Sequence, residues 1–134
     1  MERQQINPWS WQERFGYSQA WRVEGAGALV FTAGQGPVSA SGQLVGDDDF
    51  DEQVRQTFRC LETVLGAAGA SLDSIVKLGV FLTDIGRLRD YGRVRGEFLT
   101  GPPPASTAVE VGALALPGMM IEVEAVAAVA ARAA

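Results

Sequence analysis

The 134-residue sequence contains no histidine. This absence excludes the Ser-His and Cys-His pairs of nucleophilic catalysis, a histidine general base, and the histidine-containing ligand sets usual for zinc and non-haem iron. Acid–base chemistry in this chain must rest on carboxylates, on tyrosine, on the single lysine or cysteine, or on bound water. We therefore expect no metal site and no cofactor.

Lysine is almost absent too. Lys77 is the only one beside ten arginines, and the net charge is −5. An acidic chain argues against a nucleic-acid partner, because phosphate binding needs clustered Lys and Arg. Arg87, Arg89, Arg93 and Arg95 do form a cluster, but acidic residues interrupt it. We interpret that cluster as a solvated helix face.

Cysteine and long apolar runs are also scarce. The single cysteine, Cys60, excludes an internal disulfide and indicates a reducing compartment. No apolar run reaches the roughly 18 residues of a membrane span, and residues 1–16 are too polar for a signal peptide. The expectation is a cytoplasmic protein with no membrane partner.

The remaining composition is that of a globular chain, with 47% apolar and 20% charged residues, and its length fits one domain, residues 1–134. The clearest helix lies within residues 47–69, where Asp49 and Glu52 resemble a capping pair. The apolar residues that repeat at helical spacing are Phe50, Val54, Phe58, Leu61, Leu65 and Ala68.

The strand pattern is strongest in residues 75–82, which are nearly all apolar and predict a central strand covered on both sides. A second helix is expected over about residues 85–99, ended by Gly101 and three prolines. Further strands are expected in the segments 17–23, 28–33, 39–46, 105–114 and 119–130. The first three of these read as an antiparallel meander.

This order of elements predicts an α+β fold, with two helices packed on one face of a mixed, mainly antiparallel sheet. The other face of such a sheet must be covered as well. Oligomerisation is the economical way to cover it.

Two carboxylates stand in the last predicted strand. Glu122 and Glu124 share one strand face, on the order of 7 Å apart, while Ile121 and Val123 share the other. Carboxylates this close influence each other's ionisation where water is scarce, and a carboxylate in an apolar cleft is a candidate general acid or base. The alternatives are a wet face, or pairing with arginines of a neighbouring chain.

Other candidate groups lie in loops and at a strand start. Residues 32–35 ("TAGQ") could offer backbone N–H groups to a ligand, or form a plain hairpin turn. Ser106 and Thr107 follow the prolines, and without a histidine their hydroxyls are ligands or turn formers rather than nucleophiles.

Several short motifs occur in order along nearly the whole chain. They are "GYSQA" (16–20), "GQGPV" (34–38), Gln53, "AAGASLDSIVKLGVFLTDI" (67–85), "PPAST" (103–107), "VEV" (109–111) and "IEVEAVA" (121–127). With these motifs the sequence resembles the Rid (YjgF) family, formerly labelled L-PSP endoribonucleases. The resemblance implies a chorismate-mutase-like fold, a homotrimer, and small-molecule clefts between subunits. It also implies hydrolysis of reactive enamines or imines to a keto acid and ammonia.

Carried over residue by residue, the resemblance places Glu122 on the water-positioning glutamate and Tyr17 on the cleft tyrosine. Gly34, with its neighbours Ala33 and Gln35, falls on the backbone that lines the pocket.

The sequence departs from the family pattern at the arginine that holds the substrate carboxylate. The expected "P-A-R" reads "P-A-S", so Ser106 stands where the family has an arginine whose guanidinium binds the carboxylate through two hydrogen bonds. Ala108 and Gly92 replace a common cysteine and asparagine. An arginine from elsewhere, such as Arg14 or Arg22, is one alternative, and a ligand that is neutral or carries its charge elsewhere is the other.

The leading hypothesis is a homotrimeric enzyme that hydrolyses or tautomerises an imine or enamine, with Glu122 handling water or a proton. Tyr17, the amides of residues 33–35, Ser106 and Thr107 would bind the substrate. The alternative is a catalytically inactive trimer that binds a ligand or protein in the same clefts. Ribonuclease activity fits poorly with a net charge of −5 and no histidine.

Overall fold

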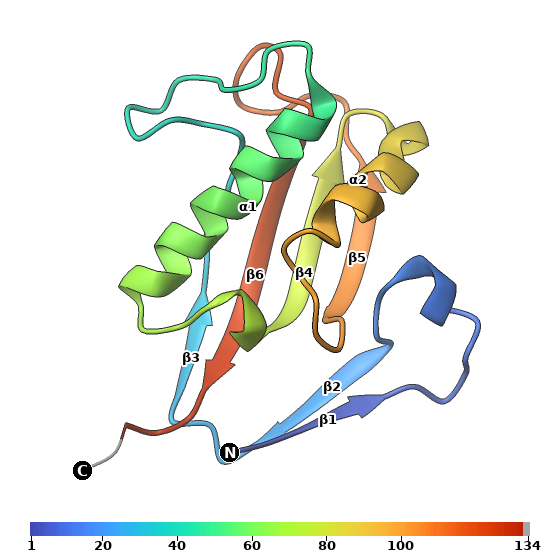
Figure 1. Cartoon of the computed structure of the whole chain (residues 1–134), viewed down its shortest axis with the longest axis vertical. Coiled ribbons are helices and arrows are strands. Elements are labelled where there is room, and N and C mark those ends of the chain that lie inside the picture. Colours follow the sequence, from blue (N-terminus) through green and yellow to red (C-terminus); the bar gives the residue numbers. More distant parts are fainter. Residues whose placement is uncertain (133–134) are drawn as a thin grey trace.

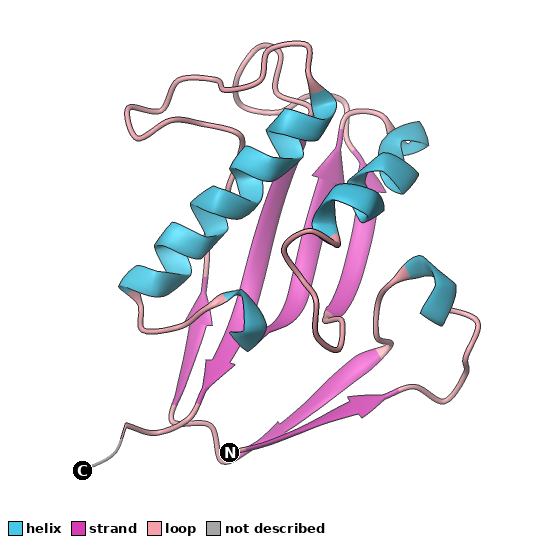
Figure 2. Cartoon of the chain, viewed as in Figure 1, coloured by secondary structure: helices cyan, strands magenta, loops and turns pink. Residues whose placement is uncertain are grey.

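The computed structural model describes residues 1–132 and shows two helices lying across one face of a four-stranded sheet (Figures 1 and 2). A separate two-stranded ribbon projects beside this sheet. The elements are β1 (Glu2–Ile6), β2 (Ala20–Glu24), β3 (Ala28–Phe31), α1 (Phe50–Ala67), β4 (Ile75–Leu82), α2 (Leu88–Arg95), β5 (Ala105–Glu110) and β6 (Ile121–Val129).

The main sheet has the strand order β3-β6-β4-β5. Only β4 and β5 run parallel, and the other neighbours are antiparallel. The expected mixed sheet with two helices on one face is therefore confirmed. No helix in the described part of the chain is long and apolar enough to cross a membrane.

The expected N-terminal meander is wrong. Strand β2 pairs with β1, which sequence analysis missed, and β3 pairs with β6 from the other end of the chain. The segment 39–46 forms no strand, only a bridge between Val38 and Leu44. Strand β1 escapes detection because its side chains are nearly all polar and exposed, so they show no apolar alternation.

Helix α1 follows the expected pattern closely. Its N-cap is Asp49, whose side chain accepts a hydrogen bond from the Glu52 amide (3.1 Å) and satisfies one free N–H of the first turn. Every apolar residue predicted for its inner face is buried except Ala68, which is exposed because the helix ends at Ala67.

Helix α2 is shorter than predicted. A 3-10 turn (Ile85–Arg87) precedes it, and the regular helix ends at Arg95. Tyr91 and Val94 are buried, whereas Leu88, at the helix start, is exposed.

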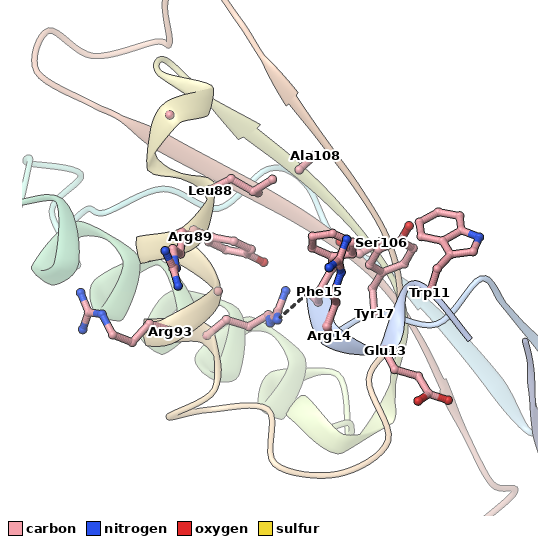
Figure 3. Close-up of a pocket in the computed structure, with 15 residues that line it drawn as sticks. Trp11, Glu13, Arg14, Phe15, Tyr17, Leu88, Arg89, Arg93, Ser106 and Ala108 are labelled. Carbon is pink, nitrogen blue, oxygen red and sulfur yellow. Dashed lines mark hydrogen bonds between the residues drawn. The ribbon is translucent and has the colours of Figure 1, made fainter. Parts of the chain in front are cut away.

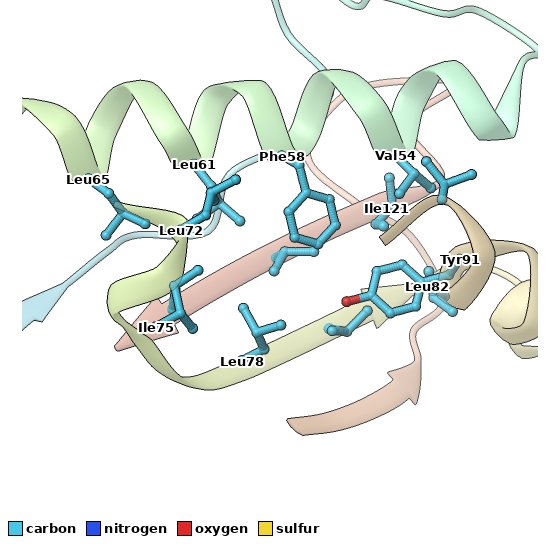
Figure 4. Packing of buried hydrophobic residues seen from close by; sticks show 14 of the residues in the cluster. Val54, Phe58, Leu61, Leu65, Leu72, Ile75, Leu78, Leu82, Tyr91 and Ile121 are labelled. Carbon is cyan, nitrogen blue, oxygen red and sulfur yellow. The ribbon is translucent and has the colours of Figure 1, made fainter. Parts of the chain in front are cut away.

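The core fills the space between the helices and the sheet (Figure 4). On β4, Leu78, Val80 and Leu82 face the helices. The Phe58 ring stacks on Tyr91 and Phe98 at centroid distances of 6.2 and 5.4 Å, which joins α1 to α2.

The opposite face of the sheet, which we call the open face, carries exposed apolar side chains. Leu29 and Phe31 of β3 are 53% and 71% exposed, and Val109 of β5 is 41% exposed. Strand β4 is central, as predicted, but in the protomer helices cover it on one side only.

Gln53 ties α1 to the start of β6. Its buried side-chain amide donates to the carbonyl oxygens of Gly46 (3.1 Å) and Gly118 (2.8 Å), and its oxygen accepts from the Met120 amide (2.8 Å). All the hydrogen bonds of this buried group run to backbone, so it positions the strand that follows.

We expect Gln53→Leu to lower the free energy of unfolding by about 3 kcal/mol, because it removes all three backbone hydrogen bonds of a buried amide, including the part-buried ones to Gly118 and Met120. Urea unfolding measures the change. Gln56→Leu is the matched control, since Gln56 is partly buried and donates one backbone bond, to Val38 (2.8 Å); it should cost about 1 kcal/mol. Equal losses for both variants would contradict the positioning role.

Tyr91 makes stability depend on pH in the alkaline range. Burial raises its pKa to about 12, an effect that nearby Arg95 only partly offsets, and its hydroxyl finds no hydrogen-bond partner within residues 1–132. The unfolded chain loses this proton near pH 10, so stability should fall between about pH 10 and 12.

Tyr91→Phe should therefore match or exceed the wild-type stability at pH 8 and lose less of it at pH 11. Urea unfolding at the two pH values checks this. Tyr17→Phe, which removes the other of the two tyrosines, is the control. A Tyr91→Phe variant that declines in parallel with the wild type would contradict the assignment.

Candidate functional site

Glu122 lies on β6, on the open face, and is half-buried. The strand register sets it opposite Phe81 of β4. Its carboxylate rests against Gly34, where an added β-carbon would overlap the carboxylate oxygen. Glycine at position 34 is therefore what lets this carboxylate lie against the backbone.

The loop of residues 33–35 is held in place by β6. The Gln35 amide donates to the Val123 carbonyl (2.8 Å), and the Val123 amide donates back to Gln35 (2.9 Å). The segment thus continues along β6 and is not a hairpin turn. Neither the Ala33 nor the Gly34 amide donates a hydrogen bond within residues 1–132, so two N–H groups of this loop, one of them on the glycine against which Glu122 rests, are free for a ligand.

Glu124 lies two residues along the same face and is exposed, with its carboxylate against Gly79 of β4. Within the described residues no arginine forms an ion pair with Glu122 or Glu124. Pairing inside the protomer therefore does not explain the two carboxylates.

Thr107 also belongs to the open face, where its hydroxyl accepts a hydrogen bond from Lys77 Nζ (3.0 Å). In the sequence Lys77 stands out only as the single lysine, and no site was predicted for it. Its place in strand β4, two residues before Gly79, is the signal that could have put it on this face.

Tyr17 and Ser106 lie elsewhere, in a cleft of about 1080 Å³ on the helix side of β5. Ser106 alternates with Thr107 and pairs in register with buried Leu78, so it faces α2. A 3-10 turn (Glu13–Phe15) and Tyr17 form the opposite wall (Figure 3). The Tyr17 ring meets Trp11 edge to face, with ring centroids 6.3 Å apart.

Four arginines line this cleft, and sequence analysis assigned only one of them to a possible site. They are Arg14 from the 3-10 turn and Arg89, Arg93 and Arg95 from α2. The prediction of a solvated helix face holds for Arg89 and Arg93, which are exposed, whereas Arg95 is half-buried. Arg22 is the other arginine considered as a substitute for the one that the family resemblance implies at position 106. It lies on β2 and pairs with Glu24.

The arginines of the cleft differ in what they contact. Arg93 donates to Asp51 on α1 (2.6 Å), and this hydrogen bond raises the pKa of Arg93. Arg95 donates to the Phe15 carbonyl (3.4 Å), the bond drawn in Figure 3. The cleft is thus strongly basic although the chain as a whole is acidic.

The predicted site residues therefore form two groups on opposite faces of one sheet. Glu122, Thr107 and the loop of residues 33–35 lie on the open face, and Tyr17 with Ser106 lies in the basic cleft. A single protomer does not bring the two groups together. Among the described residues no group of three or more Cys, Asp or Glu side chains could hold a metal ion.

Known sequences match this chain over most of its length. Residues 11–129 match the family model Endoribonuclease L-PSP. The chain is 35% identical over 111 residues to the protein DfrA of Myxococcus xanthus, and this alignment covers 83% of each chain. It is 38% identical over 110 residues to the RutC family protein y4sK of Sinorhizobium fredii, across 82% of this chain and 84% of that protein.

Solved structures agree. YyfB from Yersinia pestis, a protein of unknown function from the conserved Rid family, matches with a TM-score of 0.87 at 34% identity, over 96% of this chain and 100% of that one. RidA from an Antarctic Psychrobacter matches with a TM-score of 0.70 at 32% identity, over 84% and 88% of the two chains. This chain therefore belongs to the Endoribonuclease L-PSP family, which includes the Rid proteins.

Proposed function

We propose that the protein is a homotrimer of the chorismate-mutase-like type whose subunits cover one another's open faces. The exposed Leu29, Phe31 and Val109 support this, because a sheet face with several large apolar side chains is stable in water only when it is covered. A closed three-fold arrangement would leave no such face uncovered.

The division of the candidate residues over two sheet faces is the observation that carries the functional proposal. Glu122 of one subunit can meet the cleft of Tyr17 and Ser106 only if that cleft belongs to a neighbour. The ligand site would then lie between subunits, with a carboxylate from one side and the basic cleft from the other.

The reaction we propose for this site is hydrolysis of an imine, or of an enamine after tautomerisation. Glu122 accepts a proton from a water molecule whose oxygen attacks the C=N carbon. The protonated carboxyl returns this proton to nitrogen, which gives a carbinolamine. Glu122 then takes the hydroxyl proton of the carbinolamine and passes it to nitrogen as the C–N bond breaks, so that a carbonyl compound and ammonia leave. The unpaired amides of Ala33 and Gly34 support this proposal, because they are free to bind polar atoms of the reacting group.

A second candidate is binding without turnover, and Ser106 favours it, because a serine cannot supply the charged fork that Rid enzymes use. Ribonuclease activity, which the family description names, is not adopted, because the chain has no histidine and a net charge of −5.

We expect Glu122→Gln to slow hydrolysis of imines by at least about 100-fold, because the amide cannot accept the proton. The assay measures release of carbonyl product from imines generated by an amino-acid oxidase and from a panel of uncharged enamines. Glu124→Gln is the control, since Glu124 shares the strand face but lies apart from the amides of residues 33 and 34. Turnover that survives Glu122→Gln, or no turnover with any substrate, would reject the enzymatic proposal.

The assembly is tested separately. Phe31→Glu should convert a trimer to monomers without unfolding the chain, because the side chain is 71% exposed in the protomer but would be buried between subunits. Val64→Glu, at a 37% exposed position on α1, is the matched control and should remain trimeric. Sedimentation analysis gives the mass, and a wild type that sediments as a monomer would refute the trimer.

A further inference from the structure

The basic cleft holds more positive charge than its own acids neutralise. Of its four arginines, only Arg93 forms an ion pair within the described part of the chain, with Asp51 and Asp90 at 2.6 and 3.8 Å. Arg14, Arg89 and Arg95 have no carboxylate within ion-pair distance among residues 1–132, and Glu13 is the one acid in the lining. The cleft is therefore suited to an anion.

Arg95 is the best positioned of these cations. Its guanidinium lies 5.5 Å from the centroid of the Tyr91 ring and donates to the Phe15 carbonyl. Gly16, at φ +73°, makes room for it, because a β-carbon there would overlap the guanidinium. Packing and one hydrogen bond hold the group, so most of its five N–H donors remain free to bind a ligand.

A free hydroxyl lies in the same cleft. Ser106 projects from β5, is half-buried, and its hydroxyl makes no hydrogen bond within the described residues. A hydroxyl can both donate and accept, so this group is available to a polar ligand in the cleft. Tyr91 also lines the cleft, but its hydroxyl is fully buried and out of a ligand's reach.

The mouth of the cleft is aromatic. Trp11 and Phe15 are 54% and 52% exposed, although they line a concave site. Together with Tyr17 they form an apolar lip on the wall opposite α2 (Figure 3). Such rings favour a flat or bulky apolar group on the ligand.

We propose that Arg95 binds the carboxylate of the ligand in place of the arginine that Ser106 replaces, and that this carboxylate carries an aromatic or bulky apolar group. The guanidinium that binds the carboxylate then comes from α2 instead of β5, and the Ser106 hydroxyl donates a further hydrogen bond to the same carboxylate. The inference rests on the proposed function for the location of the site, but binding itself requires no turnover.

Calorimetry with phenylacetate, acetate and 2-phenylethanol separates the two parts of the ligand. Phenylacetate should bind the intact protein more tightly than acetate or 2-phenylethanol. Arg95→Met should weaken phenylacetate on the order of 10- to 100-fold and leave 2-phenylethanol unchanged. Arg87→Met, which removes an equal charge outside the cleft beside the Phe50 ring, should change neither affinity.

Ser106→Arg placed in the Arg95→Met background should restore phenylacetate binding, which a merely structural role of Arg95 would not predict. Two results would overturn the inference: equal weakening of phenylacetate binding by Arg95→Met and Arg87→Met, or equal affinity of the protein for phenylacetate and 2-phenylethanol. Neither result would contradict turnover through Glu122. Binding that depends on Arg95 in a protein without turnover would instead support the inference and reject the enzymatic proposal.

Discussion

The two-residue alternation of strand β6 is the constraint on which both the core and the candidate site depend. Its odd positions from 121 to 127 fill the space beneath the helices, while Glu122 and Glu124 point to the open face. A register shift of one residue would bury both carboxylates and expose the apolar side chains, so the hydrophobic core itself holds Glu122 in place. Gln53 secures the same register from α1, because it binds the backbone of Met120 directly before the strand begins.

At position 106 the family resemblance implies an arginine and this chain has a serine, but the cleft of this chain is basic all the same. A strand side chain reaches the cleft from the sheet, whereas Arg95 reaches it from a helix that packs on that sheet. Gly16 leaves space that the Arg95 guanidinium fills, and an arginine at position 106 would add like charge to a cleft that already has four arginines. A serine at position 106 is thus consistent with the proposal that Arg95 binds the carboxylate of the ligand.

Local patterns predicted the local structure well. The capped helix α1 and strands β4 and β6 follow from periodicity within single segments, and the position of Glu122 on a strand face follows with them. The pairing of β3 with β6, and the cleft between residues 13–17 and α2, join segments that lie about seventy or more positions apart. Periodicity holds no information about such contacts, which is why the arginines were recognised as exposed but not as the lining of a cleft.

The surroundings of the two glutamates explain why the chemistry is assigned to one of them. Both carboxylates lie over a glycine, but Gly79 belongs to a strand whose backbone is paired on both sides, so Glu124 has no free backbone N–H beside it. Gly34 follows the end of β3, where two amides are unpaired, and Glu122 is already half-buried there. A neighbouring subunit that covers this face would exclude more water and strengthen every electrostatic contact around the carboxylate. The same assembly step that buries the exposed apolar side chains would therefore complete the environment in which Glu122 can transfer a proton.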